Sequence, residues 1–274
     1  MRGRTRAALV AALTGLLATT ATVAGTAPTT AATTATTAGV AAAHTAAEDH
    51  DSAVIRKRVL GRSVQGRKIM AYRLGEPGET KVVLISTMHG NEPHTRQILR
   101  ALVDGKPVHG IDLWVVPTYN PDGLAAGTRK NARGVDLNRN YPHNWRDLDG
   151  NYESGPRPAS EPETRAMMRF LRDVKPRRIL SFHQPLHGVD TDTKDRKFAQ
   201  KVARKLDLPR KTFDCGGVCH GTMTSWYNAT FKGSALTVEY GASPPRRRMR
   251  VTAPRQVLSI WGAWRGDPQA EPVD

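Results

Sequence analysis

After about residue 50, the chain alternates short apolar runs with amphipathic stretches. The apolar runs are rich in β-branched residues and show no helical periodicity, which is typical of buried strands. They lie at residues 81–87, 111–117, 178–182 and 233–240. Two further strands, at residues 56–60 and 68–74, flank a turn that is bounded by glycines.

Amphipathic stretches between these runs predict helices at residues 92–103, 160–174, 194–206 and 255–264. Pro93 falls in the first turn of the first helix, and Ser160 is placed to cap the second. Residues 120–123 read as a turn, and residues 124–159 as a long loop, which inside a domain is often functional. Alternating strands and helices indicate an α/β fold: one domain with a mixed, mostly parallel twisted sheet and helices on both faces.

The beginning of the chain, residues 1–27, is typical of a secretory signal peptide. Three arginines precede a short apolar segment, and small residues then offer cleavage sites. The alternative is an uncleaved membrane anchor, which the short apolar core disfavours. Residues 28–50 are an Ala/Thr-rich tract that predicts a disordered spacer. Residues 51–268 then form the folded domain, and 269–274 a tail, so we expect a secreted, extracellular protein without stable membrane insertion after signal cleavage.

The formal net charge of the chain is +16 at pH 7. This charge indicates anionic surroundings, with cell-wall polymers and acidic peptides as the main candidates. Nucleic acid is not expected as a partner, because no basic motif is interleaved with aromatic residues. Four arginines near the carboxyl end are interpreted as a solvated surface: Arg246, Arg247, Arg248 and Arg250.

The two cysteines, Cys215 and Cys219, lie close together in the sequence. In an exported protein such a pair indicates a disulfide that closes a small loop. The alternative is half of a structural zinc site, but the sequence contains no second cysteine pair. We therefore favour the disulfide.

Polar residues follow the ends of several apolar runs, where open α/β sheets keep their functional sites. His89 and Glu92 follow one run, and His183 and Glu239 end two others. Two histidines and a glutamate with a fourth position left open are a donor set of catalytic zinc. Each residue also has a simpler interpretation. His89 could be a surface histidine beside Glu92 at the start of a helix, and His183 could be a hydrogen-bonded histidine of the core. Glu239 could lie at the solvent end of its strand. Glu239 could instead be an acid–base group in a partly dry pocket.

The long loop adds groups that could hold a substrate. Arg129 and Arg139 can grip a carboxylate with two hydrogen bonds, and Asn138 adds a further donor. Asp136 could accept the second ring N–H of a ligand histidine and so fix its tautomer. For each arginine taken alone, the alternative is a role in solubility.

Taken together, these residues resemble the zinc carboxypeptidases of the M14 type, and among them the bacterial murein peptide amidases. The similarity covers about residues 60–240. It rests on motifs that are weak singly but specific in this order: Gly61-Arg62-Ser63, His89-Gly90-Asn91-Glu92, Asn120-Pro121-Asp122-Gly123, Gly134 to Pro142, Ser160 to Thr164, Ser181-Phe182-His183 and Val238-Glu239. The resemblance implies a zinc carboxypeptidase-like fold.

The resemblance also implies a metal centre and a base. It assigns His89, Glu92 and His183 as ligands of one Zn²⁺ ion. It makes Glu239 the general base that activates water and then protonates the leaving amine. Asp136 would orient the first histidine.

For the substrate, the resemblance makes Arg129 the group that polarises the scissile carbonyl. Asn138 and Arg139 would bind the terminal carboxylate. Two departures concern specificity. Residues 215–220 contain no tyrosine where digestive carboxypeptidases have a mobile one, a feature shared with murein amidases, and Gln184 stands where those amidases often have aspartate.

We therefore expect a zinc-dependent metallopeptidase, a hydrolase, that cleaves an amide next to a free C-terminal carboxylate. The implied bond joins γ-D-glutamate to diaminopimelate in peptidoglycan peptides. One alternative is an ordinary metallocarboxypeptidase that releases C-terminal amino acids from peptides. Another is a non-catalytic cell-wall-binding protein, although the metal ligands and the base are all present. The expected partner is a cell-wall peptide, bound by a monomer.

Overall fold

The computed structural model describes residues 52–213 and 215–266. The predicted signal peptide at residues 1–27, the spacer at 28–50 and the tail at 269–274 lie outside these described residues. Within the described part, no helix has both the length and the apolar character that crossing a membrane requires.

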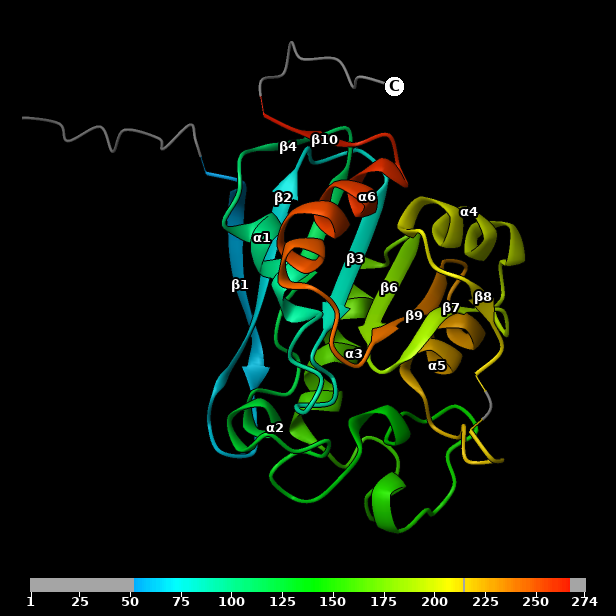
Figure 1. The fold of residues 1–274 in the computed structure, drawn as a ribbon. Helices are drawn as coiled ribbons and strands as arrows, with labels where there is room; N and C mark the ends of the chain where they lie inside the picture. The colour runs from blue at the N-terminus through cyan, green and yellow to red at the C-terminus, as the bar shows by residue number, and fades with distance from the viewer. Residues whose placement is uncertain (1–51, 214, 267–274) are drawn as a thin grey trace, which may run out of the picture. The chain divides into compact units, whose positions relative to one another are not determined.

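A sheet in the order β1-β2-β5-β3-β6-β9-β7-β8 runs through the described residues (Figure 1). Its inner strands β5, β3, β6 and β9 are parallel to one another. Antiparallel pairs lie toward both edges, where β2 joins β5 and β7 joins β9. The strand bounds are β1 Val54–Arg62, β2 Lys68–Gly75, β3 Lys81–Ser86, β5 Asp112–Val116, β6 Arg178–His183, β7 Leu186–Asp190, β8 Arg210–Lys211 and β9 Ser234–Gly241.

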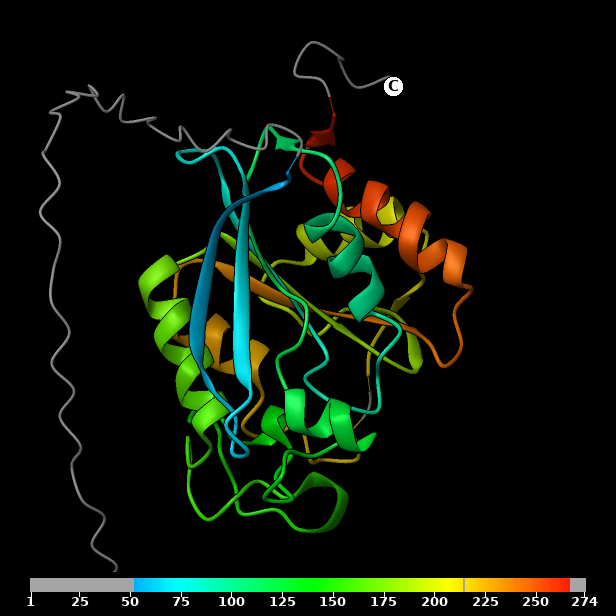
Figure 2. The ribbon, with the colours of Figure 1, turned by 90° about the vertical axis from the view of Figure 1, so that its left-hand side faces the viewer.

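Helices cover both faces of this sheet, as the view in Figure 2 shows. One face packs against α1 (Arg96–Val103), α4 (Arg196–Leu206) and α6 (Ala253–Ser259). The other face packs against α3 (Pro162–Val174) and α5 (Met223–Thr230). The predicted fold class is thereby confirmed.

Strand β3 shows why its sequence is apolar without alternation. Val82 and Leu84 belong to the core under α1, α4 and α6, whereas Val83 and Ile85 belong to the core under α3 and α5. Successive side chains of a strand point to opposite faces, so a strand covered on both faces needs apolar residues at every position.

Several short elements complete the described chain. The strands β4 and β10 form a separate small antiparallel pair. These elements are β4 Val108–His109, α2 Pro121–Ala126, the 3₁₀ turns η1 Leu137–Arg139 and η2 Gly150–Tyr152, the π-helical turn η3 Arg248–Thr252, and β10 Trp264–Arg265. The sequence patterns predicted none of β7, β8 and α5.

The predicted start of the first helix is wrong. Helix α1 begins at Arg96, four residues later than expected, so Pro93 lies before it. The backbone turns between the strand and the helix instead, with the Glu92 N–H donating to the His89 carbonyl at 3.1 Å. Local propensity favoured a helix from residue 92, but the turn brings the side chains of His89 and Glu92 to one point.

Two further predictions, a turn at residues 120–123 and an N-cap at Ser160, are also wrong. The expected turn at residues 120–123 is the start of α2, because the Asn120 side chain accepts a hydrogen bond from the Gly123 N–H. The N-cap of α3 is Glu161 rather than Ser160. The Ser160 hydroxyl donates to the Glu161 carboxylate at 2.8 Å, so it serves a buried network and not the helix end.

The last predicted helix, residues 255–264, is shifted toward the amino terminus. The turn η3 leads into α6, which ends at Ser259. Arg248 does not belong to a solvated surface, since its guanidinium donates to the carbonyls of Leu206 and Asp207 at 3.0 and 2.9 Å. A cation at the carbonyl end of α4 is favoured by the helix dipole. Arg246, Arg247 and Arg250 are exposed as expected.

Candidate active site

The candidate active site lies where the parallel strands β3, β6 and β9 end. His183 and Glu239 are register partners at the carboxyl ends of β6 and β9. His89 and Glu92 follow the end of β3, which pairs with β6. Carboxyl ends of neighbouring parallel strands meet at one edge of a sheet, so residues far apart in sequence are brought together.

Three side chains of this group converge on one point. The Nδ1 atom of His89 lies 2.7 Å from one oxygen of Glu92, and the Nδ1 atom of His183 lies 3.0 Å from the other. One potential ligand atom of each residue lies within 4.8 Å of the other two, and all three residues are buried. Two imidazoles and a carboxylate in this arrangement could hold a metal ion.

The remaining ring nitrogens of both histidines are also held. The Nε2 atom of His89 lies 3.0 Å from Asp136 Oδ1, and the Nε2 atom of His183 lies 2.9 Å from the Ser181 hydroxyl. Such partners fix the tautomer and orientation of a metal-binding histidine. Asp136 was expected in this place, whereas Ser181 was not.

The charges of the cluster are strongly coupled. Burial by itself would raise the pKa of Glu92, but the adjacent His89 and His183 outweigh it and lower the pKa to about 2. Burial would lower the pKa of His89, but Asp136 and Glu92 outweigh it and raise the pKa to about 9. The pKa of Asp136 is lowered in the same way, chiefly by His89 and Arg129 against its own burial. The two carboxylates therefore stay ionised and attract a positive charge.

The loop that carries His89 is braced by the motif at residues 120–123. A Cβ on Gly90 would lie 1.9 Å from the carbonyl carbon of Gly123, so only glycine permits this contact. The Asn120 N–H donates to the Thr87 carbonyl at 2.9 Å, and its side-chain amide contacts the Met88 carbonyl. Residues 120–123 therefore position the loop that carries His89 and Glu92, and they do not line the active-site cavity described below.

Arg129 lies beside the three converging residues. Its Nε and Nη2 atoms donate to one oxygen of Asp136 at 3.0 and 2.8 Å, which fixes the guanidinium. Its Nη1 atom lies 3.8 Å from a Glu92 oxygen. The guanidinium is thus held at the edge of the cluster, facing the same cavity.

Asn138 and Arg139 form the next part of the cavity wall, and Tyr152 joins them. The Arg139 guanidinium lies over the Tyr152 ring at 4.9 Å, and Arg129 stacks on the same ring at 5.5 Å. The buried Nε atom of Arg139 has no hydrogen-bond partner among the described residues. Asn138 accepts a hydrogen bond from the Met223 N–H through its Oδ1 atom, which leaves its amide nitrogen for a ligand.

Glu239 is buried and has one engaged oxygen. Its Oε2 atom accepts a hydrogen bond from the Leu186 N–H at 3.2 Å, while Oε1 has no partner among the described residues. Burial raises its pKa above the ordinary value, although His183 acts in the opposite direction. A raised pKa makes a carboxylate a stronger base, which favours its use as a proton acceptor.

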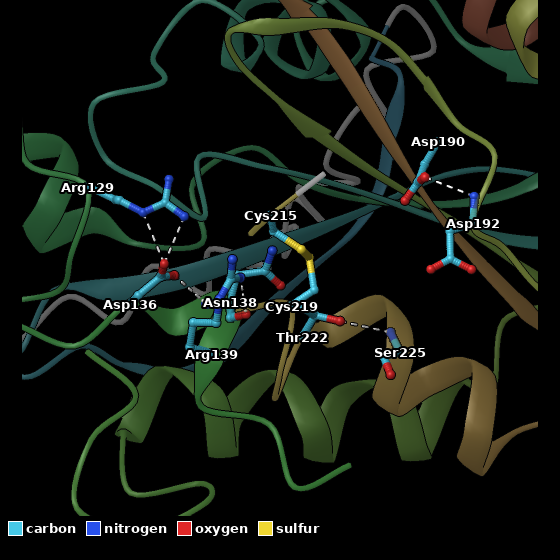
Figure 3. The surroundings of a disulfide bond; sticks show 10 residues. All are labelled: Arg129, Asp136, Asn138, Arg139, Asp190, Asp192, Cys215, Cys219, Thr222 and Ser225. Carbon is cyan, nitrogen blue, oxygen red and sulfur yellow. Dashed lines mark hydrogen bonds and ion pairs between the residues drawn. A yellow bond between two sulfur atoms is a disulfide. The ribbon is translucent and has the colours of Figure 1, made fainter. Parts of the chain in front are cut away.

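Eight of these residues line one cavity of about 790 Å³: His89, Glu92, Arg129, Asn138, Arg139, Tyr152, His183 and Glu239. Two acids, Asp190 at the end of β7 and Asp192, line it as well. Burial and the nearby Asp192 raise the pKa of Asp190 to about 6, even though backbone amides donate to it. Neither acid forms an ion pair with a described residue. In Figure 3 the two acids lie on the opposite side of the disulfide from Arg129 and Asp136.

The structure joins Cys215 and Cys219 in a disulfide, and both residues line the cavity. The loop that they close is followed by Thr222, which caps α5 by accepting from the Ser225 N–H. The disulfide thus restrains a short wall of the cavity between the arginines and the acids (Figure 3).

Other residues of interest turn out to be structural. Tyr227, the nearest tyrosine before Glu239, is buried and donates its hydroxyl to the Pro176 carbonyl, so it is not available to a ligand. Gln184 accepts from the His94 N–H and donates to the Gly241 and Ala242 carbonyls. An aspartate could not make both kinds of bond at position 184.

Sequence reasoning missed the cavity residues Tyr152, Asp190 and Asp192. Tyr152 lies in an irregular loop whose path no local pattern specifies. Asp190 ends β7, and the pattern Leu-His-Gly-Val-Asp gave no strand signal. The only available hint was an Asp-Thr-Asp sequence shortly after the third predicted strand.

Comparison with known proteins gives a consistent result. The family model Peptidase_M14, described as zinc carboxypeptidase, matches residues 40–191. Murein peptide amidase A of Escherichia coli strain K12 is 30% identical over 184 residues, which are 61% of this chain and 74% of that protein. The catalytic chain of human carboxypeptidase N is 26% identical over 247 residues, with 64% of this chain and 53% of that protein covered.

Solved structures show the same fold. The crystal structure of a murein-tripeptide amidase from Escherichia coli O157 matches with a TM-score of 0.64 and 25% identity, covering 77% of this chain and 93% of that chain. Carboxypeptidase A from Helicoverpa armigera matches with a TM-score of 0.65 and 17% identity, over 77% of this chain and 68% of that chain. The second likeness concerns the fold alone.

Proposed function

Because the chain belongs to the zinc carboxypeptidase family and is therefore a hydrolase of the metallopeptidase class, we propose a specific activity for it. It is a zinc-dependent peptidase that cleaves an amide next to a free carboxylate, with the γ-D-glutamate–diaminopimelate bond of peptidoglycan peptides as substrate. The observation that carries this proposal is the convergence of His89, Glu92 and His183 beside Glu239 in one cavity.

The donor set fits one zinc ion. Neutral imidazole and carboxylate are ligands that zinc accepts, and a fourth position stays open for water or substrate. Asp136 and Ser181 already hold the ring nitrogens that face away from the shared point. When bound there, zinc lowers the pKa of a coordinated water and polarises a carbonyl oxygen.

Glu239 is the proposed acid–base residue. Its free oxygen accepts the proton of the attacking water and later delivers it to the leaving amine. The Leu186 N–H holds the other oxygen, so the carboxylate keeps a fixed orientation. The raised pKa, caused mainly by burial, suits a group that must act in both directions.

The two arginines serve different parts of the substrate in this proposal. Arg129, fixed by Asp136, offsets the negative charge that develops on the carbonyl oxygen. Arg139 and Asn138 bind the free carboxylate, using the unpartnered Nε atom and the amide nitrogen. Stacking on Tyr152 holds Arg139 in place.

The acids of the cavity support a diamino acid as the released residue. Asp190 and Asp192 have no cationic partner among the described residues, and they lie across the disulfide from Arg129 (Figure 3). The side chain of diaminopimelate ends in an amino group and a second carboxylate, in addition to the carboxylate at the cleavage site. An ammonium group near Asp190 would compensate a carboxylate that burial otherwise disfavours.

The acids Asp190 and Asp192 are also consistent with one alternative activity. An ordinary carboxypeptidase that releases C-terminal lysine or arginine would also use an acid in this cavity. The two activities differ in the bond cleaved, since the murein substrate is joined through the γ-carboxyl of D-glutamate. The similarity to murein peptide amidase A favours the first activity.

We also propose that the protein acts outside the cytoplasm. The support is the pattern of residues 1–27, which is typical of a secretory signal. Extracellular wall fragments would then be within reach of the enzyme.

The proposal is tested by mass spectrometry of a digest of L-Ala-γ-D-Glu-diaminopimelate, run beside a peptide with C-terminal arginine. Each reaction is run with added zinc and with a chelator. Chelator-sensitive release of diaminopimelate is expected. Release of arginine alone would establish the alternative, and no release of either from the zinc-loaded protein would refute the proposed activity.

A further inference from the structure

A second concave surface lies at the opposite ends of the same strands. Two adjoining clefts of about 570 and 600 Å³ share Thr80, Arg177 and Arg178. Lys81 and Arg178, which line these clefts, are the first residues of β3 and β6, whereas the candidate active site lies at the carboxyl ends of these strands. Figure 1 shows the strands with both of their ends. A six-residue strand such as β6 is about 20 Å long, so the two surfaces are well separated. The clefts and the active-site cavity share no lining residue.

This surface, which we call the basic groove, concentrates cations without neutralising them. Six of its lysines and arginines form no ion pair with any described residue: Lys81, Lys175, Arg177, Lys197, Lys201 and Lys232. Only Arg178 is paired, with Asp195 at 2.8 Å. Glu79 is the one acid of the groove outside that pair. Like charges gathered in a concave surface repel one another and focus a positive potential that attracts anions.

Several of the cations lie on backbone that is hydrogen-bonded to neighbouring segments. The Arg177 N–H donates to the Lys81 carbonyl at 2.8 Å, and the Arg177 carbonyl accepts from the Ser234 N–H at 3.1 Å. Lys197 and Lys201 are one turn apart on α4. The charges are therefore spread along the groove at positions fixed by three strand starts and a helix.

We propose that the basic groove binds an anionic polymer with repeating phosphodiester groups, of the polyol-phosphate kind. A chain of phosphates can engage cations of both adjoining clefts at once, whereas a single phosphate would engage only a part of them. The first cleft has no aromatic lining residue. In the second, Trp261 is half-buried and packs against Phe198. Single-stranded nucleic acid is normally held by stacking its bases on aromatic side chains, so a polymer without bases fits better.

This inference does not depend on the proposed peptidase activity. Binding through the amino ends of the strands would leave the cavity at their carboxyl ends open. The groove would thus retain the protein on a phosphate-rich surface while a peptide enters the other side.

The test measures binding of a fluorescent poly(glycerol phosphate) oligomer to the full chain by anisotropy, at several salt concentrations. The groove variant carries four substitutions: Lys81→Gln, Arg177→Gln, Lys201→Gln and Lys232→Gln. A control variant loses the same charge elsewhere on exposed, unpaired residues: Lys57→Gln, Arg246→Gln, Arg247→Gln and Arg250→Gln. Melting temperature and hydrolysis of a small peptide verify that both variants fold.

The groove variant should bind at least about tenfold more weakly at low salt, and the slope of log affinity against log salt should fall by roughly 3, because a single-stranded polyanion releases about 0.7 counterion per neutralised phosphate. The control should stay within about twofold of the parent. An equal loss in both variants would mean that net charge alone binds the polymer, which overturns the proposal. Tighter binding of a single-stranded DNA with the same number of phosphates, weakened by the groove substitutions, would also overturn it in favour of nucleic acid.

Discussion

Replacing Asp190 by asparagine gives the sharpest test of how the cavity selects its substrate. The carboxylate lines the cavity, has no cationic partner among the described residues, and has a pKa of about 6 because of burial and the nearby Asp192. If it binds the side-chain ammonium of the released residue, Asp190→Asn removes a charge-assisted hydrogen bond. Such a bond contributes about 1.5–3 kcal/mol, and partial exposure places Asp190 at the lower end.

A loss of about 1.5 kcal/mol predicts a decrease of about tenfold in kcat/KM for substrates with a basic released residue. Substrates whose released residue is neutral should be unaffected, because they do not reach Asp190. The ratio of the two kcat/KM values isolates this effect from any change in the metal centre. In the parent protein this ratio should rise as the pH increases through about 6, where Asp190 becomes charged. The same dependence should be absent from Asp190→Asn.

Although Asp190→Asn should lower kcat/KM for basic substrates, it should raise the stability of the folded protein at pH 7. The pKa of Asp190 is higher in the folded than in the unfolded chain, so between pH 4 and 6 the folded state binds more protons, and the free energy of unfolding falls as the pH rises. The shift of about two pKa units corresponds to at most about 3 kcal/mol, which solvent screening reduces to about 1 kcal/mol. Asp190→Asn should therefore raise the melting temperature at pH 7 by about 2–4 °C.

Asp192→Asn is the matched control, since it removes a charge from the same cavity wall. It should lower the pKa of Asp190 and leave most of the selectivity in place. The reasoning would be refuted if Asp190→Asn lowered kcat/KM equally for basic and neutral substrates, or if its stability at pH 7 decreased.

Four further predictions concern the metal, the base, the carboxylate site and the disulfide. Glu239→Gln should keep bound zinc, measured by metal analysis, but lose about 10²- to 10⁴-fold in kcat; retention of most activity would exclude Glu239 as the base. Asp136→Ala should weaken zinc binding by about 10- to 100-fold in a chelator competition, and an unchanged affinity would contradict its role beside His89. Arg139→Ala should raise KM by about tenfold or more for free-carboxylate peptides, while amidated peptides, already poor substrates, should not change further. Reduction of Cys215–Cys219 should lower the free energy of unfolding by about 2 kcal/mol in chemical denaturation, because the closed loop is small.

The sequence by itself specified the strands that build the site. The run at residues 82–85 is apolar at every position, and this pattern predicts a strand that is buried on both faces, whatever its neighbours are. Polar residues at the ends of such runs then pointed to His89, His183 and Glu239. These predictions depended on local patterns, which a sequence displays directly.

Helix boundaries depended on contacts that the sequence does not display. Glu92 was placed at the start of a helix because local propensity favours it, but the chain turns first, and α1 begins at Arg96. Ser160 has the chemistry of an N-cap, yet it is used by a buried network with Asn140 and Glu161. Tertiary partners outweighed local preference in both cases.

What the sequence alone determined is therefore the fold class, the inner strands and the polar residues at their ends. Only the tertiary structure decided that Tyr152 supports both arginines, that Ser181 holds the second histidine, and that Asp190 closes the same cavity. The physical reason is that hydrophobic periodicity is a property of neighbouring positions. A cavity is formed by loops and strand ends far apart in the chain, whose distances are set only when the whole sheet has assembled.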